Sequence, residues 1–180
     1  ITILTGVAGG ATFLTPIIIS VAPGDQPIGV AVDDMNADGI PDVVTSNASS
    51  DDVTVLVGTG GGAFAAAQVF ESRPGYSGDD PRSLAIGDIN GDGDLDVVTA
   101  NDDHDSISIL AGFGDGLLAP SQTVTTRDQP RGVETGDFNA DGRLDWALVA
   151  WGGEDLQIGR QQVSGQFNIG TFRPFDGYYY

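Results

Sequence analysis

The sequence predicts an all-β protein made of repeated, four-stranded antiparallel units, and three observations carry this prediction. An acidic pattern, D-x-N-x-D-G-x-x-D, occurs three times and begins at Asp34, Asp88 and Asp137. Short stretches rich in β-branched residues recur around these patterns, separated by Gly, Pro and Asp. No stretch places apolar residues at the helical spacing of about 3.6 residues. An internal period of about 50 residues is typical of β-propeller blades and other repeat arrays.

Each unit reads as four strands in the same order. A Pro opens the first strand, the acidic loop and the second strand follow, and a glycine-rich turn leads from the third strand to the fourth. The region 1–180 is predicted to be a single propeller, divided into 1–25 (the second half of a blade), 26–75, 76–125 and 126–180. In the half unit, 1–6 matches a third strand and 13–21 a fourth.

Three full units plus a half unit are too few to close a ring, since propellers usually have about 4–8 blades. We therefore expect the chain either to be part of a larger propeller or to be completed by another subunit. An open strand edge is a ready template for such pairing.

The composition restricts the partners. There are 26 acidic residues against 7 basic ones, a formal net charge of −19. Such a surface repels the phosphates of nucleic acids and of anionic membranes. The purely apolar runs, such as 17–19, are far too short to insert across a membrane. The sequence has no cysteine, so disulfides contribute nothing to stability, which leaves packing and any bound metal.

The acidic loops have the donor pattern of a calcium site. Oxygen ligands at positions 1, 3, 5, 7 (through the main-chain carbonyl) and 9 suit Ca²⁺, which takes about 6–8 oxygens, and a Gly after position 5 permits the reversal of the chain. The predicted ligands are Asp34, Asn36, Asp38, Ile40 and Asp42 in the first loop, Asp88, Asn90, Asp92, Asp94 and Asp96 in the second, and Asp137, Asn139, Asp141, Arg143 and Asp145 in the third. We expect about three Ca²⁺ per chain, one in each loop.

These loops are not EF-hands, because position 12 is Thr45, Thr99 or Leu148 instead of Glu and a strand follows each loop. Mg²⁺ is disfavoured because it retains its waters. The alternative is three Asx-rich turns without metal.

The loops and the strands around them resemble the calcium-binding repeats of FG-GAP/VCBS type, found in integrin α-subunit propellers and in secreted bacterial and fungal propellers. The resemblance covers nearly the whole chain. It implies a β-propeller whose blades carry Ca²⁺ between their first two strands. Family members include adhesion heads, fungal lectins and parts of secreted polysaccharide-active enzymes, and the fold does not select among them.

Residues outside the acidic loops give weaker indications of a functional site. His104, the one histidine, could join Asp102, Asp103 and Asp105 around a transition metal, but a solvated turn is the favoured interpretation. Acidic residues outside the loops could form a two-carboxylate glycosidase site, but they lie in no recognisable pattern, and we expect them to be solvated. These residues are Glu71, Asp79, Asp80, Glu134 and Glu154. Asn47 begins a glycosylation sequon, but Asn101 occupies the same place in the next unit, which favours a structural role.

Several aromatic residues gather late in the chain, at Trp146, Trp151, Phe172, Phe175 and 178–180. Exposed aromatics could stack on sugar rings, whereas Trp146, which aligns with Val43 and Val97, is predicted to pack in the core. No physical role is assigned to Tyr178–Tyr180.

The sequence thus predicts an extracellular or surface-displayed, calcium-stabilised, non-catalytic module that binds a glycan or a protein ligand in recognition or adhesion. The alternatives are a structural subunit that assembles with further copies of itself, and an accessory propeller of a polysaccharide-active enzyme.

Overall fold

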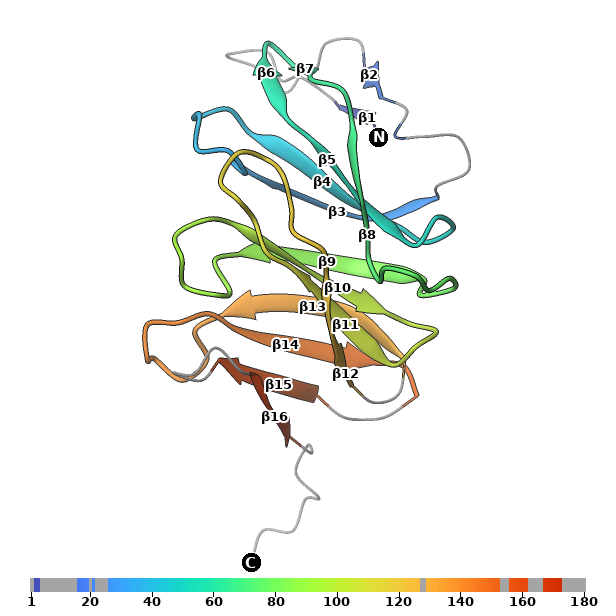
Figure 1. The fold of residues 1–180 in the computed structure, drawn as a ribbon, viewed down its shortest axis with the longest axis vertical. Coiled ribbons are helices and arrows are strands. Elements are labelled where there is room, and N and C mark those ends of the chain that lie inside the picture. Colours follow the sequence, from blue (N-terminus) through green and yellow to red (C-terminus); the bar gives the residue numbers. More distant parts are fainter. Residues whose placement is uncertain are drawn as a thin grey trace, which may run out of the picture.

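The computed structural model describes residues 2–3, 16–19, 21, 26–126, 129–152, 156–161 and 167–172, and every regular element among them is a β-strand. Three four-stranded antiparallel sheets follow one another along the chain and lie stacked in Figure 1. They are propeller blades, as the repeat predicts, and we call them blades 1, 2 and 3. Within the described ranges, no helix is long and apolar enough to cross a membrane.

The strands have the following bounds. A two-stranded sheet of β1 (Thr2–Ile3) and β2 (Ile17–Ile18) precedes the blades. Blade 1 consists of β3 (Pro27–Asp33), β4 (Asp42–Asn47), β5 (Asp52–Leu56) and β8 (Gln68–Glu71), with a short hairpin of β6 (Gly58–Gly60) and β7 (Ala63–Phe64) between the last two. Blade 2 consists of β9 (Pro81–Gly87), β10 (Asp96–Asn101), β11 (Ser106–Leu110) and β12 (Gln122–Thr125). Blade 3 consists of β13 (Pro130–Gly136), β14 (Asp145–Ala150), β15 (Leu156–Gln161) and β16 (Phe167–Phe172).

The blades are joined through their first strands. In every blade the four strands lie in sequence order, and β9 contacts both β3 and β13. Near the start of β3 and of β13 the register shifts by one residue, directly after Pro27 and Pro130. Proline has no N–H to donate to a ladder, which suits a position at the start of a strand.

The apolar core lies between the blades. The blade 1–2 cluster brings Val44 and Val55 of blade 1 against Leu84 and Val97 of blade 2. The blade 2–3 cluster contains Val98, the residue directly after Val97. Successive side chains of a strand point to opposite faces, so one strand of blade 2 supplies both clusters.

Burial on both faces explains the apolar composition of the middle strands. Every residue of β4, β5, β10 and β11 is buried, and a fully buried Val or Leu side chain contributes about 1.5–3 kcal/mol. Acidic loops run directly into valine-rich strands because the loops lie at the blade ends, whereas the strands lie between blades.

Trp146 is fully buried in the blade 2–3 cluster, which confirms its predicted packing role. Blades 1 and 2 place a Val–Leu pair at this cross-strand position, Val43 opposite Leu56 and Val97 opposite Leu110. Blade 3 places Trp146 opposite Gly159 instead. A Cβ atom on Gly159 would lie 2.0 Å from Cε2 of the indole. The small residue therefore makes room for the large one.

Asn47 and Asn101 have the structural role that their alignment predicts. Both are fully buried at the end of a second strand. Asn47 Nδ2 donates to Asp52 Oδ1 at 2.6 Å and to Thr54 Oγ1 at 2.8 Å. Asn101 makes the equivalent bonds to two serines of β11. A buried Asn47 amide engaged in this way is not presented for glycosylation.

Candidate functional site

The three acidic loops lie where the sequence predicts, between the first and second strands of each blade. Their backbones share one conformation, because the fourth and sixth positions have positive φ angles in every loop. The sixth position is Gly39, Gly93 or Gly142, with φ between 82° and 97°. Glycine adopts this region without a steric penalty, so the predicted role of these three glycines is confirmed.

The side chains at positions 1, 3 and 5 gather around one turn of backbone. In the second loop, Asp88 accepts hydrogen bonds from the amides of Asp92 and Gly93, both at 3.0 Å, and Asn90 Oδ1 accepts from Asp92 at 2.7 Å. The amide of Asp94 at position 7 donates to Asp92 at 2.9 Å. The first and third loops repeat these bonds through Asp34, Asn36, Asp38 and Ile40, and through Asp137, Asn139, Asp141 and Arg143.

Position 9 differs from the others because its carboxylate is buried. Asp96 accepts hydrogen bonds from the amides of Ile89 at 2.9 Å, Asn90 at 3.0 Å and Gly112 at 2.8 Å. Asp42 likewise accepts from two amides, one in its loop and one just after the third strand. Asp145 is also fully buried. In blades 1 and 2 the position-9 aspartate therefore ties the loop to the end of the third strand, a role that the sequence pattern did not indicate.

Burial and hydrogen bonding shift the pKa values of two loop carboxylates, Asp96 and Asp137, in opposite directions. Burial raises the pKa of Asp96, although the amides of Gly112, Asn90 and Ile89 oppose it. The pKa of exposed Asp137 is lowered, chiefly by the hydrogen bond from the amide of Gly142. Asp137 is therefore a ready anion at the surface, whereas Asp96 carries its charge at a cost.

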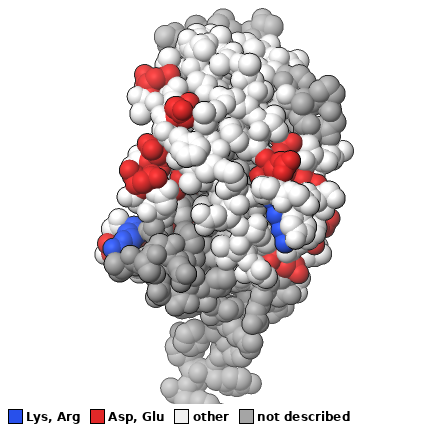
Figure 2. Space-filling view, viewed as in Figure 1, with Lys and Arg blue, Asp and Glu red and all other residues white. Residues whose placement is uncertain are grey.

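At the opposite end of the strands, two aspartates hold the connections between blades. Asp51 Oδ2 accepts from the amide of Gly78 at 2.6 Å, and its Oδ1 accepts from the amide of Asp80 at 3.0 Å. Asp105 Oδ1 accepts from the amide of Gln129 at 2.7 Å. Figure 2 shows acidic side chains gathered on both sides of the blade stack, with a largely uncharged middle.

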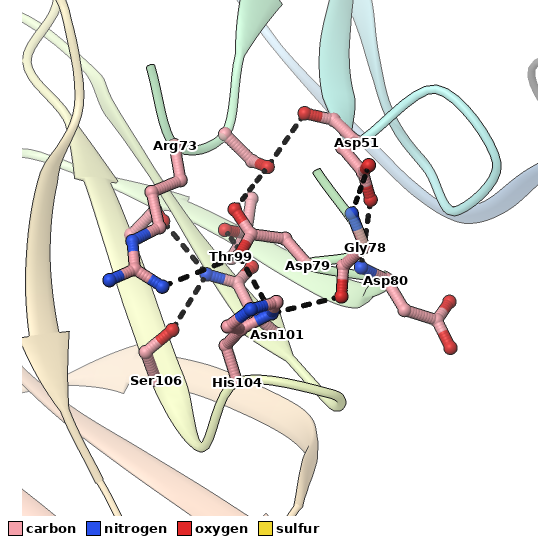
Figure 3. A network of polar contacts seen from close by, with 11 residues as sticks. Asp51, Arg73, Gly78, Asp79, Asp80, Thr99, Asn101, His104 and Ser106 are labelled. Carbon is pink, nitrogen blue, oxygen red and sulfur yellow. Dashed lines mark hydrogen bonds and ion pairs between the residues drawn. The ribbon is translucent and has the colours of Figure 1, made fainter. Parts of the chain in front are cut away.

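The expectation that Asp79 is solvated is wrong, whereas His104 lies in an exposed turn, as expected. Asp79 is fully buried, and its Oδ1 accepts no hydrogen bond among the described residues. His104 Nδ1 lies 3.3 Å from that oxygen and 2.9 Å from the carbonyl oxygen of Gly78 (Figure 3). Ser72 Oγ donates to Asp79 Oδ2 at 3.3 Å, and Arg73 Nη1 lies 3.8 Å from Oδ1. The contacts join the connection after blade 1 to a turn of blade 2.

Ionisation of Asp79 should make the free energy of unfolding fall as pH rises, the opposite of the usual effect of an aspartate. Burial raises its pKa above the ordinary value of 3.8, although His104, Ser72 and Arg73 lower it. The folded state therefore holds the proton more tightly than the unfolded chain. The stability from protonated Asp79 is full below the unfolded pKa and is lost as pH rises through the folded pKa. Asp79→Asn, which cannot ionise, should gain stability relative to wild type as pH rises above about 4.

Urea unfolding at a series of pH values checks this expectation, with Asp115→Asn, an exposed acid near the acidic-loop end, as the matched control. A difference between Asp79→Asn and wild type that stays constant from acidic to neutral pH would contradict it.

A polar cleft opens between blades 1 and 2 beside these contacts. Its volume is about 450 Å³, and its lining consists of Gln26, Ile28, Ala48, Ser49, Asp51, Gly78, Asp80, Arg82 and Asp103. Arg82 Nη2 lies 2.5 Å from Asp80 Oδ2, and its Nε lies 2.6 Å from Asp102 Oδ2. Arg131 Nε adds a hydrogen bond to Asp102 at 3.0 Å. The cleft thus presents charged groups that are already fixed in place.

Among the described residues, three acidic side chains with oxygens within 4.8 Å of one another are Asp80, Asp102 and Asp103, and none belongs to an acidic loop. Arg82 and Arg131 neutralise most of this charge. His104 contacts Gly78 and Asp79 instead of joining Asp102, Asp103 and Asp105 in a metal set.

Of the late aromatic residues, Trp151 is exposed and lies under the guanidinium of Arg131, 4.5 Å from the ring centroid. Such a cation–π contact at an exposed site contributes about 0.5–1 kcal/mol. The side chain of Phe172, and Phe175 and Tyr178–Tyr180 as a whole, lie outside the described residues.

Comparisons with known proteins agree with this architecture. The sequence profile of the FG-GAP-like repeat matches residues 34–99 and 88–148. A search of curated proteins finds no match. Among solved structures, a lectin of Agrocybe aegerita, described by its specific recognition of non-reducing terminal N-acetylglucosamine, is similar with a TM-score of 0.61 and 21% identity. The alignment covers 94% of this chain and 45% of the lectin chain, so this chain spans less than half of that structure.

Proposed function

This chain belongs to the FG-GAP-like repeat family, and on that premise we propose that it is a non-catalytic, calcium-stabilised binding module that acts outside the cell. The observation that carries the binding function is the polar cleft between blades 1 and 2. The acidic loops at the other end of the blades would bind the stabilising metal.

The proposed ligand is a glycan. Sugar hydroxyls are both donors and acceptors, and the cleft offers carboxylates, an amide and the Arg82 guanidinium to meet them. The exposed side chain of Ile28 adds an apolar contact for the C–H face of a sugar ring. A few fixed polar groups with an apolar wall are the usual composition of a small-molecule site. The fold similarity to a lectin supports the same ligand class.

The residues of the cleft support binding more than catalysis. The sequence has no cysteine and no lysine, and His104 is engaged by Gly78 and Asp79. Both oxygens of Asp51 accept backbone amides, and Asp80 is paired with Arg82. An activated nucleophile needs a free base within hydrogen-bond reach. These contacts leave Asp103 as the one carboxylate of the cleft lining without a side-chain partner among the described residues, whereas a two-carboxylate hydrolase needs two.

Binding of an oligosaccharide with terminal N-acetylglucosamine, measured by titration calorimetry, tests the glycan proposal. Asp103 lines the cleft and is exposed. We expect Asp103→Asn to weaken binding about tenfold, equivalent to about 1.4 kcal/mol. Asp115→Asn, which lies away from the cleft, should bind as wild type does. No binding to this or to other terminal sugars, or unchanged binding by Asp103→Asn, would overturn the proposal.

The loop residues fit calcium by their donor chemistry. Positions 1, 3, 5 and 9 are oxygen donors in all three loops, and position 7 offers its carbonyl whatever its side chain, Ile40, Asp94 or Arg143. An ionised carboxylate has about four lone-pair sites, so an oxygen that accepts one amide can still bind a cation. The ions would be held by the residues that the sequence predicts, from Asp34 to Asp42, Asp88 to Asp96 and Asp137 to Asp145. Bound calcium would relieve the repulsion among each loop's carboxylates.

Asp92→Ala tests the loop assignment directly. Position 5 is exposed, so its loss should remove one ion without unfolding a blade. Calcium content, measured by atomic emission after dialysis, should fall by about one ion per chain. Asp115→Asn should leave it unchanged. Equal calcium content in Asp92→Ala and wild type would rule out the second loop as a site.

An extracellular location fits these properties. Calcium sites in extracellular modules bind at about 10⁻⁴–10⁻³ M, concentrations that are available outside cells. Fractionation of a producing culture, with the protein followed by antibody, checks the location; recovery of the protein only inside cells would contradict it.

A further inference from the structure

We propose that the two end faces of the blade stack bind each other between two copies of this chain, head to tail. The first face is formed by Val30 and Val32 of β3, which are 62% and 61% exposed. Their equivalents in the next blade are Leu84, which is 8% exposed, and Ile86, and both pack in the blade 1–2 cluster. In blade 3 the equivalent of Val30 is Val133, 2% exposed. Only on β3 is this apolar position uncovered.

The second face lies at the other end of the stack. It is formed by Phe138, Val149 and Leu156, which are between 40% and 55% exposed. Their equivalents in blade 2 are Ile89, Ala100 and Ile107, all fully buried in the blade 2–3 cluster. Val149 lies opposite Leu156 in the sheet just as Ala100 lies opposite Ile107. These residues therefore form the surface on which a following blade packs.

The two faces are complementary because the chain already joins the same surfaces twice. At each internal junction, the first-strand residues of one blade pack on the second face of the blade before it. Within one chain the two end faces cannot meet, because blade 2 separates them (Figure 1). A second copy of the chain offers the missing surface with the same geometry. Such a contact is heterologous and leads to rings or open arrays.

The second face also carries Glu134, which is exposed where blades 1 and 2 have Ala31 and Ala85. Covering a carboxylate opposes association, so we expect contact between copies to be reversible and Glu134→Ala to strengthen it.

Sedimentation of the full chain over a range of concentrations, up to about 100 µM, tests this proposal. Wild type should associate, and Val30→Asp and Val149→Asp should each be monomeric. Val69→Asp is the matched control, because Val69 is 54% exposed on the outer strand β8; it should associate as wild type does. Circular dichroism melting confirms that each variant is folded.

Mixing the two monomeric variants decides the geometry. Val30→Asp retains the second face and Val149→Asp retains the first, so an equal mixture should form a one-to-one dimer. Glu134→Ala should associate at lower concentration than wild type. A wild type that stays monomeric, a Val149→Asp variant that still associates alone, or a mixture that does not pair would each overturn the proposal. None of these readouts depends on a glycan.

Discussion

Replacing Asp96 with alanine is expected to lower the free energy of unfolding by about 3–4 kcal/mol. The carboxylate accepts hydrogen bonds from three backbone amides, those of Ile89, Asn90 and Gly112, and it is fully buried. Alanine leaves these donors without their acceptor in the interior, where an unmet hydrogen bond costs about 1–3 kcal/mol. Urea unfolding measures the change.

The measurement should be made both in calcium and in chelator, because Asp96 is also a proposed calcium ligand. The loss of its hydrogen bonds should persist in chelator, whereas any loss of calcium binding disappears there. Asp115→Asn serves as the control and should stay within about 0.5 kcal/mol of wild type. An Asp96→Ala variant as stable as the control in chelator would show that these amides do not depend on the carboxylate.

A double-mutant cycle at Trp146 and Gly159 should show strong coupling. Gly159→Leu places side-chain atoms where the indole lies, since even its Cβ would approach Cε2 to 2.0 Å. We expect a loss of about 3 kcal/mol or more from this overpacking. Trp146→Val removes a fully buried ring and should cost about 3–5 kcal/mol.

The double variant restores the Val–Leu pair of blades 1 and 2 and should recover at least about 2 kcal/mol relative to the sum of the single changes. Urea unfolding of the four proteins gives this coupling energy. Additive losses would mean that Trp146 and Gly159 do not share one packing site.

The repeat made the fold predictable from sequence. Each unit carries its own strand and turn signals, so the acidic loop, the second strand and the asparagine at its end could be aligned three times. The alignment of Trp146 with Val43 and Val97 predicted its burial for the same reason. Residues that act within one unit, such as Asn47 and Asn101, were therefore read correctly.

Contacts between units were not predictable in this way. The burial of Asp79 depends on the path of the connection into blade 2, which no local pattern encodes, and its neighbours Ser72 and His104 are seven and twenty-five residues away in the chain. The anchoring aspartates Asp51 and Asp105 recur at equivalent turns, a signal that was present in the sequence. Val30 occupies the same position in its strand as Leu84 and Val133, so the sequence pattern gives no sign of its different exposure. Val30 is exposed because no described blade packs against it.

Calcium in the acidic loops is proposed to stabilise the blades, and thermal melting with and without chelator tests this role most directly. Hydrogen bonds to the loop backbone hold the side chains at positions 1, 3 and 5 close together. Removing the ions should therefore leave these clustered carboxylates to repel one another. We expect a melting temperature lower by about 10 °C or more in chelator, restored by added Ca²⁺ but not by Mg²⁺. An equal melting temperature in calcium and in chelator would contradict the claim and leave the loops as metal-free Asx turns.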